Sequence, residues 1–417
     1  ISVGVIGYLS FVHQSISDLM AVASAEFKKG NNEAAKEALT QVVGRDVGNE
    51  AAYRMLAEIA EAEKDYSSAV YYWSAVSRLN PLDKTADVQF YRAAYLSGVG
   101  TVAFKRFEVT KVMDGVPDSL LYRFGLSAVL SSSMETAMKI KAELEERKSP
   151  YEKLMSINLD YFMNVPDAFK EFEKLYAENP EAGVADCLCV ILAAECITRN
   201  DTARADELLK KITGADEYAK MDSLLLTAQR VFAGGDNVKA RELFKQAYEM
   251  QRLNTQLLLA FVELAFITDD LEDLQEIRER LNVNTNAGLA LDYYIRSFCA
   301  ALEQKNDDAF KFLKLAGSFQ NRIAGRILRF KLASDLGNLT EAAEAATDLA
   351  SSMTLSPKLK QTLSTHLLAL ISKAEDNQDF GSVDMLSKSL AEVDPNQAVE
   401  IGYSMRTAIT GGNYRDA

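Results

Sequence analysis

Two arginines and two tyrosines in the first third of the chain have side chains suited to holding another polypeptide. Arg54 and Arg92 each carry a planar guanidinium that can bind a carboxylate through two parallel hydrogen bonds. Tyr95 and Tyr122 offer stiff contact area that is apolar on its faces and polar at its tip. We therefore expect an acidic side chain or a C-terminal carboxylate of a partner to bind near Arg54 and Arg92. The alternative is a solvated face on which such residues form ion pairs.

Residues that would support catalysis do not form a known pattern. Residues 234–237 and 411–413 are glycine-rich, but they lack the Lys-Ser/Thr that follows the glycines of a phosphate-binding loop. Each stretch is expected at the turn of a helical hairpin. The carboxylate pairs at 145–146 and 307–308 fall at expected helix ends or turns, where they suit solvation or the helix dipole. We predict no catalytic residue, no cofactor, no small-molecule substrate and no enzymatic activity.

The cysteines and histidines do not have the spacing of metal ligands. Cys187, Cys189 and Cys196 fall on one predicted helix, and residues two apart on a helix point to different sides. Cys187 and Cys189 therefore cannot chelate one metal ion in the usual way. The chain has only two histidines, which excludes a histidine-rich site. We predict buried free thiols, including Cys299, and no metal.

The composition indicates a folded, helical and acidic protein. Of the 417 residues, 48% are hydrophobic and 25% are charged, which argues against wholesale disorder. Seven prolines and 21 glycines are too few for a protein built from many turns and short strands. The 60 acidic and 46 basic residues give a formal net charge of −14, which would repel a phosphate backbone. We therefore predict that the partner is not a nucleic acid.

The clearest pattern of helices lies at residues 50–83. Apolar residues recur there at three- and four-residue spacing along two successive segments, which places each set on one helix face. The first set is Tyr53, Leu56, Ala57 and Ala60, and the second is Ala69, Trp73, Val76 and Leu79. Asp65-Tyr66 marks the turn between the helices, and Pro81 has no amide hydrogen to donate and ends the second one.

Leu56-Ala57, Ala69, Trp73 and Pro81 resemble the tetratricopeptide repeat (TPR), a family whose unit is a helical hairpin of about 34 residues. Small side chains at Ala57 and Ala69 let the two backbones approach closely. One period earlier the equivalent positions are Ala23, Gly30, Ala35 and Leu39, and one period later they are Tyr91, Gly98, Ala103 and Phe107. The match continues along the chain, weakens after residue 254 and recovers at 337–346, so that we count roughly eleven hairpins and a partial one.

The resemblance implies an all-α fold, a right-handed α-α superhelix of the TPR-like solenoid kind. We expect one continuous repeat array over residues 16–417. We expect this array to be incomplete at its C-terminal end, because the last stretch shows a first helix, a turn and only the start of a second helix. In such arrays each hairpin packs on its neighbours, and the first helices line one long concave surface.

In families that this chain resembles, the concave surface holds extended peptides or helices of partner proteins. We expect its lining to include the first-helix residues Arg54, Glu58, Arg92, Tyr95, Tyr122, Leu126, Val129 and Leu130. One subfamily grips acidic chaperone tails with a clamp of lysines and asparagines. Met20 and Ser24 in the first unit, and Arg54 and Glu58 in the second, do not reproduce that clamp.

A second apolar surface is predicted on the seventh and eighth units. Their first helices carry Leu225, Phe232, Leu259, Phe266 and Ile267. These side chains could form a groove for a partner helix. The alternative is that they pack between successive hairpins.

Residues 1–15 form an apolar N-terminal segment that is too short to span a bilayer. It is either the end of a membrane anchor or a capping helix. No Lys or Arg precedes Lys28, so an anchor would place the body of the protein on the non-cytoplasmic side. A membrane-anchored, extracytoplasmic location and a cytoplasmic location therefore both stay open.

These patterns together predict a protein-protein interaction scaffold that binds a partner peptide or helix on the concave face of the solenoid. Two other functions stay open. The chain could be a membrane-tethered structural or assembly subunit, or the non-catalytic part of a larger enzyme or secretion complex.

Overall fold

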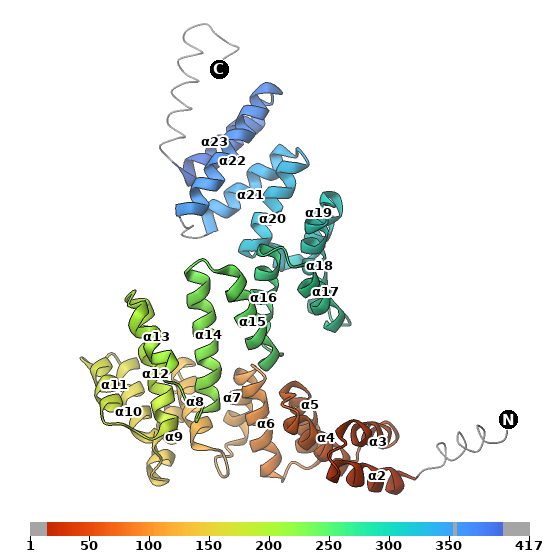
Figure 1. Ribbon diagram of the computed structural model, residues 1–417, viewed down its shortest axis with the longest axis vertical. Coiled ribbons are helices and arrows are strands. Elements are labelled where there is room, and N and C mark those ends of the chain that lie inside the picture. Colours follow the sequence, from red (N-terminus) through yellow and green to blue (C-terminus); the bar gives the residue numbers. More distant parts are fainter. Residues whose placement is uncertain (1–14, 353–356, 395–417) are drawn as a thin grey trace, which may run out of the picture. The chain divides into compact units, whose positions relative to one another are not determined.

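The computed structural model describes residues 15–352 and 357–394 of the chain. Within these residues every regular element is a helix (Figure 1). The 22 α-helices, labelled α2 to α23, pair in chain order into eleven hairpins, which we number from one to eleven. The predicted all-α class and the run of TPR-like hairpins are confirmed. The predicted partial hairpin at the C-terminal end and the apolar N-terminal segment, except Ser15, lie outside the described residues.

The chain divides into two compact units, residues 1–261 and 262–417. The first contains hairpins one to seven: α2 (Ile16–Lys28) and α3 (Asn32–Arg45), α4 (Glu50–Ala62) and α5 (Tyr66–Leu79), α6 (Lys84–Leu96) and α7 (Gly100–Thr110), α8 (Asp118–Leu130) and α9 (Met134–Glu146), α10 (Tyr151–Phe162) and α11 (Ala168–Ala177), α12 (Ala182–Thr198) and α13 (Thr202–Lys210), α14 (Glu217–Ala233) and α15 (Asn237–Met250). The division falls inside α16 (Thr255–Ile267), the first helix of hairpin eight.

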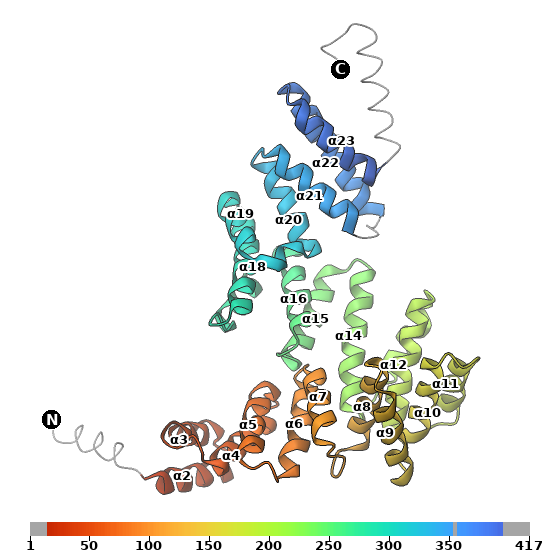
Figure 2. The ribbon, with the colours of Figure 1, turned by 180° about the vertical axis from the view of Figure 1, so that it is seen from behind.

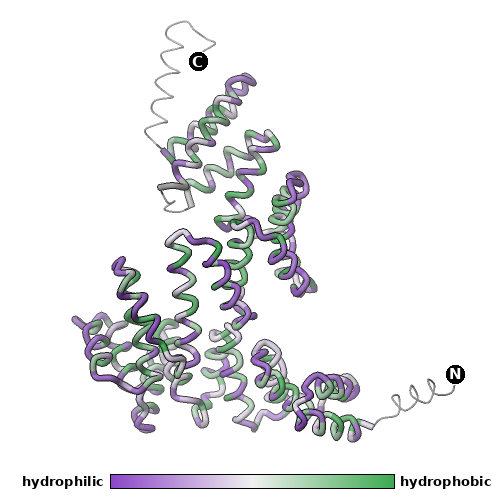
Figure 3. The backbone as a smooth tube through the Cα atoms, in the orientation of Figure 1, coloured by the Kyte–Doolittle hydropathy of each residue, from purple (hydrophilic) through white to green (hydrophobic). Residues whose placement is uncertain are grey.

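The second unit holds the rest of hairpin eight and hairpins nine to eleven. Its helices are α17 (Leu271–Arg280), α18 (Asn286–Leu302), α19 (Asn306–Leu315), the 3₁₀ helix η1 (Gly317–Asn321), α20 (Ile323–Asp335), α21 (Leu339–Ser352), α22 (Pro357–Asp376) and α23 (Phe380–Val393). Figure 2 shows the same helix pairs from behind. Along both units, hydrophobic and hydrophilic residues alternate within single helices, so each helix has an apolar side to bury (Figure 3).

Hairpin two shows why these segments fold as they do. Asn49 and Asp65 are the N-caps of α4 and α5, and their side chains accept hydrogen bonds from the amides of Ala52 and Ser68. The small residues predicted at the helix crossing, Ala57 and Ala69, are completely buried. They belong to the same apolar cluster as Trp73.

Trp73 is a core residue, as its spacing predicts, with 3% of its surface exposed. Its indole Nε1 donates a hydrogen bond of 3.0 Å to Oε1 of Glu61, so the polar edge of the buried ring is satisfied. The packing pattern of the repeat therefore holds at the residues that carried the resemblance.

Hairpin seven departs from a simple array in which each hairpin touches only its neighbours. Its first helix, α14, lies beside α12 of the neighbouring hairpin six, as the rule expects (Figures 1 and 2). Side chains of α14 also pair with Arg92 on α6 and Arg123 on α8, which are 125 and 99 residues away in the sequence. Contacts within unit 1 thus join hairpin seven to hairpins three and four, which the nearest-neighbour rule for repeats does not predict.

Candidate functional site

The N-terminus of α14 is fixed by a buried carboxylate. Asp216, which is 1% exposed, is the N-cap of α14 and accepts a hydrogen bond of 2.8 Å from the amide of Ala219. Its other oxygen accepts a hydrogen bond of 2.7 Å from the hydroxyl of Tyr151 on α10. The amide of Asp216 in turn donates to the buried carboxylate of Asp186 on α12 at 3.2 Å. Hairpins five and six therefore hold the start of this helix.

Arg123 supplies the positive charge of this buried network. Its side chain lies 3.6 Å from the carboxylate of Asp216 and donates a hydrogen bond of 2.5 Å to the carboxylate of Asp222. Asp222 lies on α14, less than two turns after Asp216. Burial opposes the charge on Arg123, but the nearby acidic groups outweigh it, so the pKa of the guanidinium lies well above its ordinary value. The arginine stays charged inside the unit.

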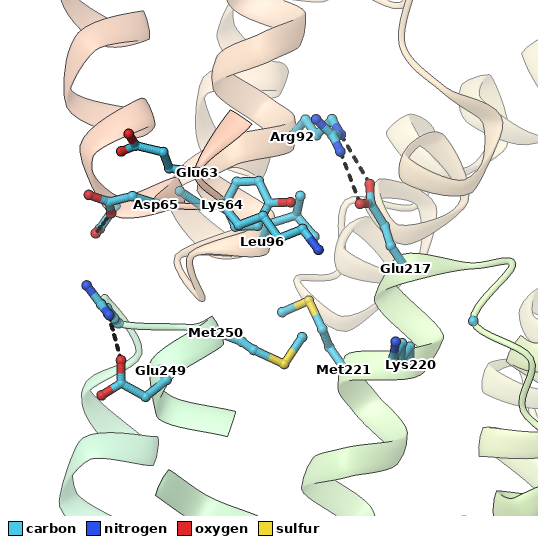
Figure 4. A pocket seen from close by; sticks show the side chains of 14 residues that line it. Glu63, Lys64, Asp65, Arg92, Leu96, Glu217, Lys220, Met221, Glu249 and Met250 are labelled. Carbon is cyan, nitrogen blue, oxygen red and sulfur yellow. Dashed lines mark hydrogen bonds and ion pairs between the residues drawn. The ribbon is translucent and has the colours of Figure 1, made fainter. Parts of the chain in front are cut away.

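A second arginine clamps the same helix from α6. Arg92 donates two hydrogen bonds of 3.1 Å, from Nε and Nη2, to the two carboxylate oxygens of Glu217 (Figure 4). Next to this pair the rings of Tyr95 and Tyr218 meet edge to face, with their centroids 5.0 Å apart. A fork-shaped ion pair and an aromatic contact thus join hairpin three to hairpin seven.

The turn of hairpin three also meets the turn after α15. The amide of Leu253 donates a hydrogen bond of 3.0 Å to the carbonyl of Ser97. Gly98, with a φ of +91°, lies so close that an added Cβ would be 2.6 Å from the Cβ of Asn254. These contacts place the C-terminal end of α15 opposite the turn between α4 and α5, with a cleft between them.

The cleft has a volume of about 720 Å³ and is lined by four segments of unit 1 (Figure 4). The α4–α5 turn and the start of α5 form one side, the end of α6 another, and α14 and the end of α15 the others. The lining residues are Glu63, Lys64, Asp65, Tyr66, Ser67, Arg92, Leu96, Gly214, Glu217, Lys220, Met221, Glu249, Met250 and Arg252. Met221 and Met250 extend into the cleft from the two helices of hairpin seven (Figure 4).

Most charges of the cleft are already paired within the chain. Glu217 is held by Arg92, and Glu249 binds Arg252 at 2.6 Å. Asp65 caps α5 and accepts hydrogen bonds from two serine hydroxyls, and its pKa lies below its ordinary value because these bonds outweigh burial.

Two lysines are the exception. The side chains of Lys64 and Lys220 are exposed and make no ion pair or hydrogen bond within the part of the chain that the structure describes.

A groove along the α14–α15 hairpin continues the cleft. It has a volume of about 830 Å³ and shares Lys220, Glu249 and Met250 with the cleft. The remaining lining residues are Ser223, Leu224 and Thr227 on α14 and Glu242, Lys245 and Gln246 on α15. Cleft and groove share these three residues, and we call the two together the α14 channel. Most of its lining residues are polar or charged, and we call the apolar ones, Leu96, Met221, Leu224 and Met250, its floor.

Arg54 and Arg92 are the arginines predicted to bind a partner's carboxylate. In the structure both bind carboxylates of the chain itself. Arg54 contacts Glu50 at 2.6 Å and Asp83 at 2.5 Å, and Arg92 contacts Glu217. Both arginines thus form ion pairs within the chain, and their role in binding a partner stays a prediction. Only Arg92 borders the cleft.

The other residues of the predicted concave surface differ in exposure. Tyr122 and Val129 are buried, and the hydroxyl of Tyr122 accepts a hydrogen bond of 3.0 Å from Asn158. Leu126 is half-buried against the core of unit 1. Glu58 is exposed, and Leu130 is 73% exposed. Their role in partner binding stays a prediction.

The apolar groove predicted on hairpins seven and eight is largely filled by packing. Leu259 is buried, and Phe266 stacks on Phe298 with ring centroids 4.3 Å apart. Leu225 is half-buried beside α15 and α16. Phe232 and Ile267, each 48% exposed, are the members that face solvent. For Phe266, which contacts Phe298 of hairpin nine, the alternative of packing between hairpins is the correct one.

All four cysteines are buried free thiols, as predicted. Burial raises the pKa of Cys187 to about 12, so the sulfur is a protonated thiol at neutral pH and a poor nucleophile. Among the described residues there is no group of three or more His, Cys, Asp or Glu side chains placed to hold a metal ion. Across the same residues, none of the helices combines the length and the apolar character that crossing a bilayer requires.

Sequence reasoning did not identify the lining of the α14 channel. Lys64, Lys220, Met221 and Met250 belong to hairpins two and seven, which the repeat pattern places five units apart. The acidic pair Asp216-Glu217 lies at the start of α14, but nothing local shows that its charges complement Arg123 and Arg92.

Comparison with known proteins yields likeness to solved structures alone. No protein-family model matches the chain, and no curated protein matches it. One similar structure is the APC/C hetero-tetramer Cut9-Hcn1, with 16% identity, 93% of this chain and 77% of that chain covered, and a TM-score of 0.36. Another is yeast Tom70, with 12% identity, 95% and 96% covered, and a TM-score of 0.32. By its own hairpin order, repeat length and small-residue crossings, the chain is an all-α array of TPR-like helical hairpins.

Proposed function

We propose that the chain is a protein-protein interaction scaffold that binds a partner peptide or helix on the side of unit 1 lined by first helices. The observation that carries this proposal is the α14 channel. It is a continuous concavity bordered by the first helices α6 and α14, with Leu96, Met221 and Met250 on its floor and charged side chains at its rim. Apolar floors with a few polar groups at the edge are typical of sites that bind polypeptide segments.

The internal closure of unit 1 supports the same function. Because Arg92, Arg123 and Asp216 hold α14 in place, the walls of the channel are fixed before a partner arrives. A preformed site loses less conformational entropy on binding than a flexible one. In this proposal Arg92 acts as a wall residue, and the exposed Glu58 and Leu130 extend the partner surface beyond the channel.

Site-specific photo-crosslinking of the full chain in its own cells tests the proposal. A photoreactive amino acid replaces Met250, which lines the channel and is 39% exposed, or Val109, which is 84% exposed on α7 of the same unit. We expect a protease-sensitive adduct from position 250 and none of the same mass from position 109. Absence of an adduct at 250, an identical adduct at both positions, or an adduct that contains no polypeptide would overturn the proposal.

A further inference from the structure

The groove of the α14 channel is lined by two helix faces onto which a third helix could pack. Its α14 lining residues are 220, 223, 224 and 227, and its α15 lining residues are 242, 245, 246 and 249. Both sets follow the spacing i, i+3, i+4, i+7, so each is one face of its helix. Two parallel rows of side chains with a furrow between them are the surface onto which a third helix packs.

The floor of the channel is apolar and adaptable. Leu224 and Met250 lie in the groove, and Leu96 and Met221 lie in the adjoining cleft. Methionine has an unbranched, polarisable side chain that adjusts to different apolar partners. Met250 is exposed at the junction of the two parts, where a partner's apolar residue would bury it.

The unpaired charges of the channel are unevenly distributed. Lys64 and Lys220, which have no ion-pair partner among the described residues, both line the cleft. The carboxylate of Asp65, also in the cleft, is occupied as a helix cap. Glu242 lines the groove and is not among the residues that line the cleft. The cleft end is therefore locally suited to carboxylates, although the whole chain carries a net charge of −14.

Resting on the function proposed above, we infer that the partner segment is an acidic amphipathic helix. Its apolar face lies on Leu224 and Met250, and carboxylates at one end face Lys64 and Lys220. Both lysines are exposed, so they set charge preference more than affinity.

Binding of three synthetic amphipathic peptides to the full chain tests the charge preference. The peptides have the same leucine positions and carry Glu, Gln or Lys at the polar positions of one end, and fluorescence anisotropy reports binding. We expect the Glu peptide to bind most tightly. Equal or tighter binding of the Gln or Lys peptide, or no binding of the Glu peptide at roughly millimolar concentration, overturns the inference.

Charge-reversal variants test whether the peptide binds in the channel. Lys64→Glu combined with Lys220→Glu should weaken binding of the Glu peptide by roughly tenfold. The matched control combines Lys148→Glu with Lys239→Glu. Lys148 has nearly the same left-handed backbone as Lys64, with φ of 54° against 59°, and Lys239 lies in the first turn of α15 as Lys220 lies near the start of α14.

The control pair should leave the affinity unchanged within about twofold. Equal effects of the two pairs would overturn the inference, and unchanged Trp73 fluorescence shows that each variant is folded. If Met250 crosslinks a protein partner while the Glu peptide fails, only the acidic-helix inference is lost. If Met250 captures no polypeptide, the proposed function is lost as well.

Discussion

At the scale of single residues, two arginines of unit 1 bind carboxylates at the start of α14, which is distant from them in the sequence. Arg92 forms a fork-shaped pair with Glu217, and Arg123 is buried between Asp216 and Asp222. The two sites differ in environment. The Arg92 pair is partly exposed and therefore contributes modestly, whereas Arg123 and Asp216 are both almost fully buried and depend on each other.

Replacing Arg123 with leucine should destabilise unit 1 by about 3 kcal/mol, because the buried carboxylate of Asp216 loses its positive partner. Urea unfolding followed by Trp73 fluorescence measures the change. The control is Arg204→Leu, which removes a surface ion pair with Glu173 whose side chains are about half exposed, and it should cost less than about 0.5 kcal/mol. Similar costs for both variants would contradict the buried network.

Tyr91 predicts a loss of stability at alkaline pH. Its ring is completely buried, its hydroxyl is hydrogen-bonded to that of Thr110, and burial raises its pKa to about 12. Below pH 10 the hydroxyl is protonated in both the folded and the unfolded chain. Between about pH 10 and pH 12 the unfolded chain loses this proton and the folded chain keeps it, so the free energy of unfolding falls as pH rises.

For Tyr91 alone the loss should reach about 0.8 kcal/mol by pH 10.5. Urea unfolding at about pH 8 and at about pH 10.5, for the natural chain and Tyr91→Phe, measures it. The variant should lose less stability over this interval, since it has no proton to release. Parallel losses in the two proteins would show that the hydroxyl does not titrate as the buried site requires.

At the scale of hairpins, equivalent turn positions differ in the space around them. Gly30 and Gly98 occupy the same place in the repeat, and both have left-handed backbone, with φ of +77° and +91°. An added Cβ at Gly30 would meet nothing within 4 Å, whereas at Gly98 it would come within 2.6 Å of Asn254 and 3.0 Å of Gln251. Of these two turns, the one in hairpin three lies against residues 251–254, and the one in hairpin one does not.

Gly98→Ala should therefore destabilise unit 1 more than Gly30→Ala does. Both variants put a Cβ on a left-handed residue, which costs about 1 kcal/mol, and Gly98→Ala adds a collision worth about 1–3 kcal/mol. Chemical unfolding of the two variants isolates the second contribution as their difference. Equal destabilisation would mean that the turn does not meet residues 251–254.

At the scale of the whole molecule, the chain has two compact units with apolar clusters of their own. Trp73 is the single tryptophan and belongs to one of the apolar clusters of unit 1, so its fluorescence reports that unit. Helical circular dichroism reports all hairpins together. Because repeat proteins are held together by local interfaces, the two units need not unfold at the same denaturant concentration.

Urea unfolding should therefore give different midpoints for Trp73 fluorescence and for circular dichroism, with more than one step in the latter. Deleting the Arg123 charge should move the fluorescence transition and leave the remaining dichroism step in place. Coincident transitions at every urea concentration would show that the chain unfolds as one cooperative body.

The sequence by itself determined the hairpins, because their signals are local. Ala57, Ala69 and Trp73 recur at helical spacing, and polar residues such as Asp65 and Asp216 stand as caps where helices begin. The number of hairpins, the core position of Trp73 and the buried thiols could all be predicted. The capacity of Arg54 and Arg92 to bind a carboxylate through two hydrogen bonds was also visible from the residue type.

Which carboxylate each arginine binds was decided only by the tertiary structure. Glu217 is 125 residues from Arg92, and the repeat rule, which considers adjacent hairpins, gives no reason to pair them. The α14 channel exists because hairpin seven lies next to hairpins two and three. The lysines and methionines that line the channel have no spacing in the sequence that sets them apart from other residues of their hairpins. Local periodicity specifies helices and their partners in a hairpin, whereas closure depends on the sum of small rotations between many hairpins.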